Sequence, residues 1–356
     1  MRKILVVDFN GTTPIYTNYF AKNLKSNKTE VEILGYKNET ELKYLKKEVK
    51  YIEINLYSKL LNYFCYWGYL FIFAKKYDIL IIEWLPFLKY SVIELYLIGF
   101  LQKRIKKSEL YYTVHNFYPH NSQNIKLKKR YEKLYKNLSN LLVHTNETKI
   151  KLKKIGVNGK ISEINHGPLY YDIDIEEKKD MKMLSMLGTI SEYKGIEDAL
   201  KAMEILKENK FYLYIAGKGD IKYINKLKKI ICEKKMEKNI FLKEGYLSTE
   251  EIIKLTKKSA VTLMPYKQIE QSGVALTSIG LNTPIVGYKV GGLKDVIVNS
   301  WNGYLVNSGD YEKLAYKVIE TIDNYENILL RSKILSERKG WQENLKLFLE
   351  SRDLNE

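Results

Sequence analysis

Residues 270–297 read EQSGVALTSIGLNTPIVGYKVGGLKDVI, and this stretch decides the fold prediction. Just before it, an apolar run at 260–266 (AVTLMPY) has the length and β-branched content of a buried strand. A helix that opens at Ser272 would follow, because serine is a favoured N-cap residue. Residues 285–290 predict the next strand, and Gly291–Gly292 predicts a turn. The stretch is therefore typical of a strand–helix–strand unit in a parallel sheet.

The start of this helix is also a candidate anion site. Free backbone amides and the positive end of the helix dipole would point into the loop before it. Gly273 would let a ligand approach the backbone closely, because it has no side chain. From these residues alone, a phosphate site and an ordinary strand–helix corner with an N-cap serine are equally good interpretations.

The composition indicates a soluble globular protein. The 356 residues suggest two domains, each large enough for its own core. Cys65 and Cys232 lie far apart in apolar, helix-like contexts, so we expect reduced and buried thiols in an intracellular protein. The run at 1–12 (MRKILVVDFNGT) is too short for a signal peptide and predicts a first strand.

The charge of the chain restricts its partners. A net charge of +17 attracts anionic lipid surfaces, phosphorylated substrates or nucleic acid. The lysines are spread over nearly every predicted helix and no nucleic-acid recognition module is visible, so we do not expect a nucleic-acid partner.

Two segments raise the question of a membrane. Residues 60–74 (LLNYFCYWGYLFIFA) form the most apolar window, but they fall short of the roughly 20 residues that cross a bilayer. They predict a buried helix or a helix on a membrane surface. The basic run at 103–107 ends another predicted helix, and it fits a helix C-terminus better than a membrane-surface patch.

Strands and helices alternate through both halves of the chain. This pattern predicts an α/β protein with two Rossmann-like, doubly wound domains that face each other across a cleft. We expect domains at 1–170 and 171–325, and carboxyl-terminal helices at 326–356 that pack back toward the first domain. Ligands bind such sheets at the carboxyl ends of the strands. The candidate residues at predicted strand ends are His115, His166, Gly188, Gly217 and Ser272.

Several motifs then resemble one known family. The segments GTISEYKG (188–195), IAGKG (215–219) and 272–297, with NGYLV (302–306) after them, resemble the carboxyl-terminal donor-binding domain of family 4 glycosyltransferases, which have the B-type fold of two Rossmann domains. The amino-terminal half resembles bacterial or archaeal members that build surface polysaccharides. Its matching segments are YTVHNFYPHN (112–121), VHTNETK (143–149) and INHGPLY (164–170).

The resemblance implies a cytoplasmic hexosyltransferase. Such an enzyme moves a sugar from a UDP- or GDP-linked donor, usually with retention of anomeric configuration, without a cofactor or a bound metal. The amino-terminal domain would bind a saccharide or polyprenyl-linked acceptor, and the carboxyl-terminal domain would bind the nucleotide sugar. The basic, aromatic-rich amino-terminal half adds the expectation of peripheral contact with the inner face of an anionic membrane.

The resemblance also assigns site residues. Lys194 matches the lysine six places after the loop glycine Gly188, which contacts donor phosphates, and an ammonium there would compensate charge on the leaving group. The amides of Ser272–Val274 match the helix start that holds the pyrophosphate. His115 matches the histidine that faces the donor sugar near its reacting carbon.

Two positions depart from the family pattern. The arginine that normally follows the loop glycine is Thr189 here. The family has two glutamates eight residues apart, and Glu270 lies near the first position as a candidate catalytic residue. The second, which usually binds the ribose, is replaced by Ser278 or, in the register of Pro284, by Thr277.

The remaining candidates follow from position. The other expected donor contacts are Gly217, Tyr246 and Leu247, and the acceptor-side candidates are Gly11, Glu83, Asn116 and His120. A lone histidine at a strand end is more often a structural hydrogen-bonding residue, which remains an interpretation for His120, His144 and His166. Residues 172–174 (DID) superficially match a metal-binding motif of another glycosyltransferase fold, but they lie in the expected linker, so no metal site is predicted.

Two alternatives stay open. A nucleotide-sugar epimerase can share this architecture, and it needs carboxylates and histidines clustered around the sugar. A non-catalytic nucleotide-sugar-binding subunit is favoured only by the missing second glutamate.

Overall fold

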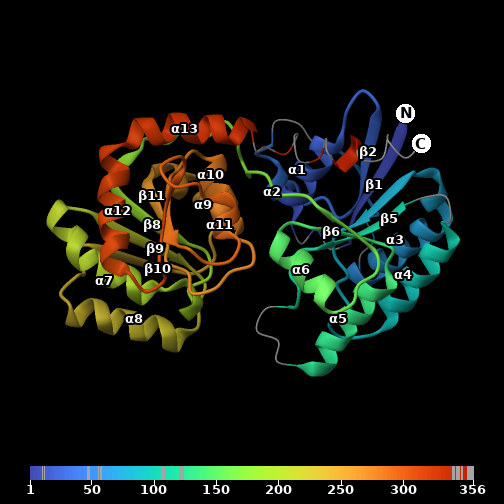
Figure 1. The fold of residues 1–356 in the computed structure, drawn as a ribbon, viewed down its shortest axis with the longest axis horizontal. Coiled ribbons are helices and arrows are strands. Elements are labelled where there is room, and N and C mark those ends of the chain that lie inside the picture. Colours follow the sequence, from blue (N-terminus) through green and yellow to red (C-terminus); the bar gives the residue numbers. More distant parts are fainter. Residues whose placement is uncertain are drawn as a thin grey trace. The chain divides into compact units, whose positions relative to one another are not determined.

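The computed structural model divides into two compact units, which are described separately. Unit 1 holds residues 1–166 with the described part of 341–356, and unit 2 holds residues 167–340. Figure 1 shows both units as sheets flanked by helices. The described residues are 1–9, 11, 13–45, 49–54, 56, 58–105, 109–119, 124–338, 341, 345 and 348–350.

Unit 1 is built on a parallel sheet that has seven strands within the described residues, in the order β3-β2-β1-β4-β5-β6-β7. The strands are β1 (Arg2–Asp8), β2 (Thr29–Gly35), β3 (Lys50–Ile52), β4 (Ile79–Ile82), β5 (Glu109–Val114), β6 (Asn140–Val143) and β7 (Lys160–Glu163). Every residue of β4 (ILII) is buried, as expected for a central strand that is covered on both faces. The amino-terminal run predicted as a first strand is β1.

The helices of unit 1 connect successive strands, as parallel pairing requires. They are α1 (Pro14–Leu24), α2 (Glu39–Leu42), α3 (Lys59–Phe73), α4 (Ile93–Arg104), α5 (Ile125–Asn137) and α6 (Asn146–Lys154). One core cluster contains Tyr63 and Trp67 of α3, Leu95 and Ile98 of α4, and Leu80 of β4. The helix α3 therefore contributes its aromatic inner face to the core.

Unit 2 repeats the arrangement with a second parallel sheet of six strands within the described chain, in the order β10-β9-β8-β11-β12-β13. The strands are β8 (Asp180–Leu187), β9 (Tyr212–Gly217), β10 (Ile240–Glu244), β11 (Ser259–Met264), β12 (Ile285–Tyr288) and β13 (Gly303–Val306). The helices are α7 (Ile196–Leu206), α8 (Ile221–Glu233), α9 (Thr249–Lys258), α10 (Gly273–Gly280), α11 (Leu293–Val296), α12 (Tyr311–Asp323) and α13 (Tyr325–Arg338).

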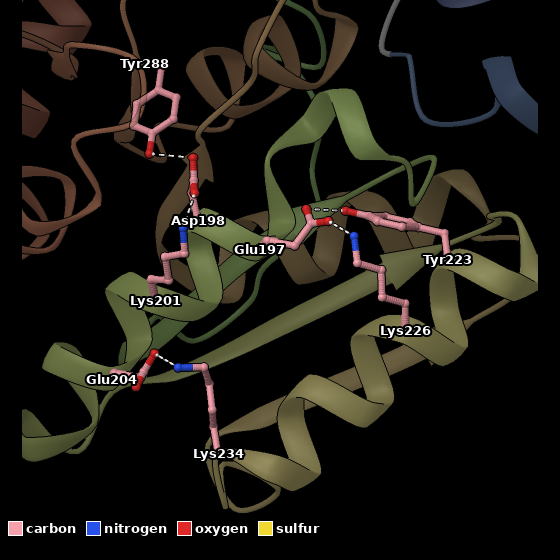
Figure 2. A network of polar contacts seen from close by, with 8 residues as sticks. All are labelled: Glu197, Asp198, Lys201, Glu204, Tyr223, Lys226, Lys234 and Tyr288. Carbon is pink, nitrogen blue, oxygen red and sulfur yellow. Dashed lines mark hydrogen bonds and ion pairs between the residues drawn. The ribbon is translucent and has the colours of Figure 1, made fainter.

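Polar contacts fix α7 against its neighbours, as Figure 2 shows. Glu197 accepts hydrogen bonds from the hydroxyl of Tyr223 (2.6 Å) and from Lys226 (3.1 Å), both on α8. The next residue, Asp198, accepts a hydrogen bond from Tyr288 of β12 at 3.0 Å. These bonds lie at the first turn of α7, directly after the loop at 188–195, and thereby anchor the end of that loop.

The two sheets with flanking helices confirm the predicted α/β class of two doubly wound domains. The expected boundaries were residues 170 and 325, whereas the units divide after His166 and after Gly340, so that α13 belongs to unit 2. Trp341 packs on Phe20 of unit 1, with ring centroids 6.2 Å apart. Phe348 packs on Tyr111 of the same unit.

The prediction of buried thiols is wrong, because Cys65 and Cys232 are both exposed. Both lie on helices, and the apolar sequence around each could not show which side of the helix faces the core. No helix within the described residues is long and apolar enough to cross a membrane.

Candidate functional site

The loop that follows β8 is shaped by glycines at its two ends. Gly188 has φ of +91° and Gly195 has φ of +65°, and residues other than glycine rarely adopt these backbone angles. A Cβ atom on Gly195 would lie 1.9 Å from the carbonyl oxygen of Pro265, just beyond β11. The loop therefore passes tightly against the end of the neighbouring strand, and its last turn carries Lys194.

Lys194 is a buried cation. It is 5% exposed, and its Nζ donates a hydrogen bond to the carbonyl oxygen of Leu187 at 2.7 Å. Burial lowers the pKa of Lys194 to about 8. No carboxylate among the described residues forms an ion pair with it. A cation in such a position is unfavourable until an anion arrives.

The start of α10 lies beside this ammonium. A Cβ atom on Gly188 would lie 3.1 Å from Lys194 Nζ and 3.6 Å from Cγ2 of Val274, so both groups border the same glycine. Ser272 is the N-cap residue, and its Oγ accepts a hydrogen bond from the amide of Ala275 at 3.2 Å. A Cβ atom on Gly273 would meet nothing within 4 Å. The structure thus brings together Gly188, Lys194 and the helix start, with open space at Gly273.

The double glycine supports the loop that carries Glu270. A Cβ atom on Gly291 would lie 1.6 Å from the carbonyl oxygen of Ile269, and one on Gly292 would lie 2.1 Å from that of Glu270. The amide of Gly292 also donates to the carbonyl oxygen of Ile269 at 3.2 Å. The turn after β12 therefore packs directly against the backbone at Glu270, which is partly buried.

The two replacements for the missing glutamate differ in their surroundings. Ser278 is fully buried, and its hydroxyl is hydrogen-bonded to Thr262 of β11 at 2.9 Å. Ser278 therefore fastens α10 to the sheet. Thr277 is buried as well, at the same turn of α10.

The other expected donor residues lie at the same edge of the sheet. Gly217 ends β9, where a Cβ atom would lie 1.8 Å from the carbonyl oxygen of Gly188. Thr189 lines a pocket of about 490 Å³ together with Lys218 of the next loop. Tyr246 is exposed, whereas Leu247 is buried in a small apolar cluster with Leu187 and Ala216. Leu247 thus packs beneath the strand ends.

In unit 1, His115 follows β5 and is held by a carboxyl group. Its Nε2 lies 2.8 Å from Oε2 of Glu83, which follows β4 and is fully buried. The imidazole stacks on Trp84 with centroids 4.3 Å apart and planes at 6°. Burial raises the pKa of Glu83 well above the usual range of a glutamate. Burial also lowers the pKa of His115 well below the usual range of a histidine. The pair therefore shares one proton and carries no net charge near neutral pH.

Two further histidines surround the ring of Tyr16 on α1. The hydroxyl of Tyr16 lies 3.2 Å from Nε2 of His144, whose Nδ1 bonds the carbonyl oxygen of Ile164 at 2.9 Å. The ring of His166 lies 4.6 Å from that of Tyr16. His115 and His144 are also neighbours, with centroids 5.2 Å apart. These groups come from the ends of β5, β6 and β7 and form one cluster.

In this cluster the sequence had assigned a specific role only to His115, and it had placed His166 among the candidates at strand ends. His144 and His166 were open to a structural interpretation, and nothing singled out Tyr16 or Trp84. The only available signal was that the histidines each follow a strand, since carboxyl ends of parallel strands meet at one edge of a sheet.

The remaining acceptor-side candidates lie elsewhere in unit 1 or outside the description. Gly11 has φ of +55° and lies close to the carbonyl oxygen of Tyr36. Asn116 is half-buried directly after His115. His120 lies outside the described residues. Within the described part of the chain, no group of three or more His, Cys, Asp or Glu side chains could hold a metal ion.

Comparison with known proteins finds similarity over most of unit 2. Residues 172–346 match the family model of glycosyl transferases group 1. This match supports a glycosyltransferase domain in the matched segment. The matched segment contains the Gly188 loop, Lys194 and the start of α10.

Two curated relatives agree with this match. The chain is 29% identical over 189 residues to the uncharacterized glycosyltransferase MJ1607 of Methanocaldococcus jannaschii. The aligned residues make up 52% of this chain and 47% of the relative. It is 26% identical over 147 residues to a poly(ribitol-phosphate) alpha-N-acetylglucosaminyltransferase of Staphylococcus aureus. These residues make up 40% of this chain and 29% of the relative. The matches thus span less than half the length of either relative.

The fold is also that of a solved structure. Anabaena Alr3699/HepE, in a crystal structure with UDP, matches 99% of this chain and 100% of its own, with a TM-score of 0.69 and 12% identity. At this identity the likeness shows the fold alone.

Proposed function

We propose that the protein is a family 4-type glycosyltransferase that moves a hexose-type sugar from a UDP- or GDP-linked donor to a saccharide or polyprenyl-linked acceptor with retention. The observation that carries the proposal is the buried ammonium of Lys194 beside the start of α10. Charge on a departing nucleotide diphosphate needs fixed positive partners. Lys194 and the free amides of α10 supply them.

The open space at Gly273 fits this assignment. A phosphate group that approaches a helix start must come within hydrogen-bonding distance of backbone amides. Gly273 is the first residue of α10 and leaves that space empty among the described residues. The solved structures of Anabaena Alr3699/HepE with UDP and with UDP-glucose add support for a nucleotide-sugar ligand on this fold.

The family resemblance supplies the proposed roles of the other residues. His115 would contact the donor sugar near its reacting carbon, and Glu270 would hold the sugar from its glycine-supported loop. We assign the ribose contact to Thr277, because the hydroxyl of Ser278 is engaged with Thr262. Charge compensation would need no bound metal in this scheme. Peripheral contact of unit 1 with an anionic membrane, within a surface-polysaccharide or glycolipid pathway, completes the proposal.

A screen for the donor tests the proposal. The protein is heated with a panel of UDP-, GDP- and other nucleotide sugars, because a ligand that binds the native state raises the melting temperature. We expect one donor class to raise it and to yield a glycosylated product when acceptors are added. If the panel produces neither stabilisation nor product, the proposal fails.

One observation favours a second function, that of a nucleotide-sugar epimerase. Such an enzyme needs carboxylates and histidines around its sugar, and unit 1 gathers His115, His144 and His166 near Glu83. Incubation of the stabilising donor without an acceptor separates the two functions. A transferase leaves the sugar of the donor unchanged, apart from slow hydrolysis, whereas an epimerase inverts one carbon of it.

A further inference from the structure

The outer face of α3 is apolar, although it faces solvent. Leu60, Leu61, Phe64 and Ile72 follow each other along one side of the helix, and each is at least half exposed. After Lys59 the helix contains no charged residue. Soluble proteins usually place polar side chains on the outer stripe of such a helix. The inner stripe of α3, with Tyr63, Tyr66 and Trp67, fills the core in the ordinary way, so the outer stripe is not needed for folding.

The adjacent helix α4 shows an inverted polarity. Its one carboxylate, Glu94, is fully buried and accepts a hydrogen bond from the hydroxyl of Tyr63 at 2.8 Å. In contrast, Ile93, Tyr96 and Phe100 point outward and are at least 45% exposed. Burying the carboxylate and exposing aromatic side chains is the reverse of the usual arrangement in a helix that faces water. Such an exposed apolar surface marks an interaction site.

The two apolar stripes form one surface. The rings of Phe71 on α3 and Phe100 on α4 meet edge to face with centroids 5.4 Å apart. Nε of Arg104 donates a hydrogen bond to the carbonyl oxygen of Phe71 at 2.6 Å. Figure 1 shows α3 and α4 side by side in unit 1. We name this surface the α3–α4 face; its residues are Leu60, Leu61, Phe64, Ile72, Tyr90, Val92, Ile93, Tyr96 and Phe100.

Basic residues border the α3–α4 face. The exposed cations on α3, on α4 and in the segments next to them are Lys59, Lys75, Lys76, Lys89, Lys103 and Arg104. The buried Glu94 is the one acidic residue on the two helices. Lys89 lies over the ring of Tyr90, with Nζ 4.9 Å from its centroid. An apolar surface with a basic and aromatic border has the chemistry of a protein surface that lies on anionic lipid headgroups.

We propose that the α3–α4 face is a docking surface for an anionic lipid bilayer. The apolar side chains would enter the boundary between headgroups and acyl chains, and the basic border would contact the headgroups. A second copy of the chain is a poorer occupant, because a two-fold contact would place the two basic borders against each other. The docking surface deepens the proposed function by identifying where a membrane holding a polyprenyl-linked acceptor would meet unit 1, but the docking itself requires no catalysis.

Vesicle flotation tests the docking surface without any donor or acceptor. The wild type is mixed with vesicles of phosphatidylcholine and phosphatidylglycerol, and separately with phosphatidylcholine alone. We expect flotation with the anionic vesicles and a decrease at high salt. The variant Phe64→Gln/Ile72→Gln/Tyr96→Gln, which keeps good helix formers at exposed positions, should bind them roughly tenfold or more weakly.

A matched variant controls for general loss of apolar surface. Tyr316→Gln/Leu330→Gln changes two side chains of unit 2 that are each 62% exposed, and it should float like the wild type. Unchanged melting temperatures show that both variants fold. No flotation of the wild type, or equal flotation of the α3–α4 variant and the wild type, would overturn the proposal. A wild-type dimer that the α3–α4 variant converts to a monomer, without a difference in flotation, would assign the face to self-association instead.

The outcome is separable from that of the proposed function. Lys194→Met should float like the wild type, and the α3–α4 variant should keep donor-induced stabilisation in the absence of vesicles. Loss of flotation alone therefore concerns the membrane surface, and loss of donor binding alone concerns unit 2.

Discussion

The pKa of Lys194 is set by its burial in the loop after β8. A pKa lowered from 10.5 to about 8 means that burial opposes the charged form by about 3 kcal/mol. The fold accepts this destabilisation beside a helix start that itself favours anions. Lys179 is a useful comparison, because burial lowers its pKa to about 8 too. Its Nζ donates hydrogen bonds to the carbonyl oxygen of Ser259 and to the hydroxyl of Thr283, whereas Nζ of Lys194 donates to the carbonyl oxygen of Leu187. A lysine with a lowered pKa is thus not by itself a ligand site.

Glu83 should act as a positioning residue for His115. Its carboxyl group holds Nε2 of His115 at 2.8 Å, so Glu83→Ala would free the imidazole to turn. We predict that Glu83→Ala lowers kcat by about a hundredfold with little change in the KM for the donor. Glu83→Gln, which can still form a hydrogen bond, should retain more activity. Steady-state kinetics checks this, and a Glu83→Ala enzyme with wild-type kcat would contradict it.

Gly273→Ala tests the open space at the start of α10. A Cβ atom there would meet no protein atom within 4 Å, and alanine favours a helix more than glycine does. The melting temperature should therefore stay the same or rise. The new methyl group would occupy the space assigned to the phosphates, so the Kd for the donor should increase roughly tenfold or more. Calorimetric titration provides the comparison, and unchanged affinity would remove the phosphate assignment from this position.

At the scale of elements, the contact between α3 and α4 includes the buried carboxyl group of Glu94. Burial raises the pKa of Glu94 to about 7, while the hydrogen bond from Tyr63 opposes the rise. Because the pKa in the folded state lies above its unfolded value near 4.5, the stabilising effect of the neutral acid is complete below pH 4.5. It is lost as the pH rises through about 7.

This predicts that the free energy of unfolding falls between roughly pH 4.5 and 7 by as much as about 3 kcal/mol through Glu94. Glu94→Gln cannot ionise and should flatten part of this decline while keeping the bond from Tyr63. Urea unfolding at a series of pH values measures the slope. An identical slope for the variant and the wild type would show that Glu94 does not titrate in this range.

At the scale of the molecule, the alternation of apolar strand-like segments with helical segments correctly predicted the two parallel sheets. Buried strands such as β4 have a clear sequence pattern, and the Lys194 loop and the α10 start carry recognisable motifs. The cluster around Tyr16 could not be predicted, because it depends on which strands are neighbours. The exposed side of α3 was equally hidden, since a helix that is apolar all round does not reveal which face is buried.

The proposal also predicts how the whole enzyme responds to metal removal. If Lys194 and the amides of α10 compensate the diphosphate charge, EDTA should leave turnover unchanged. Turnover is measured with the identified donor before and after chelation. A loss that added Mg²⁺ or Mn²⁺ restores would show that a metal shares this role, and the charge compensation would have to be reassigned.

The most direct test of the central claim is the donor-induced rise in melting temperature of Lys194→Met, compared with the wild type and with Lys179→Met. Replacing the buried ammonium with an uncharged side chain of similar length should raise the melting temperature of the free protein and abolish the rise caused by the donor. Lys179→Met, which loses its bonds to Ser259 and Thr283, should be less stable but should keep that rise. A Lys194→Met protein that the donor stabilises as much as the wild type would contradict the assignment of Lys194 to the donor phosphates.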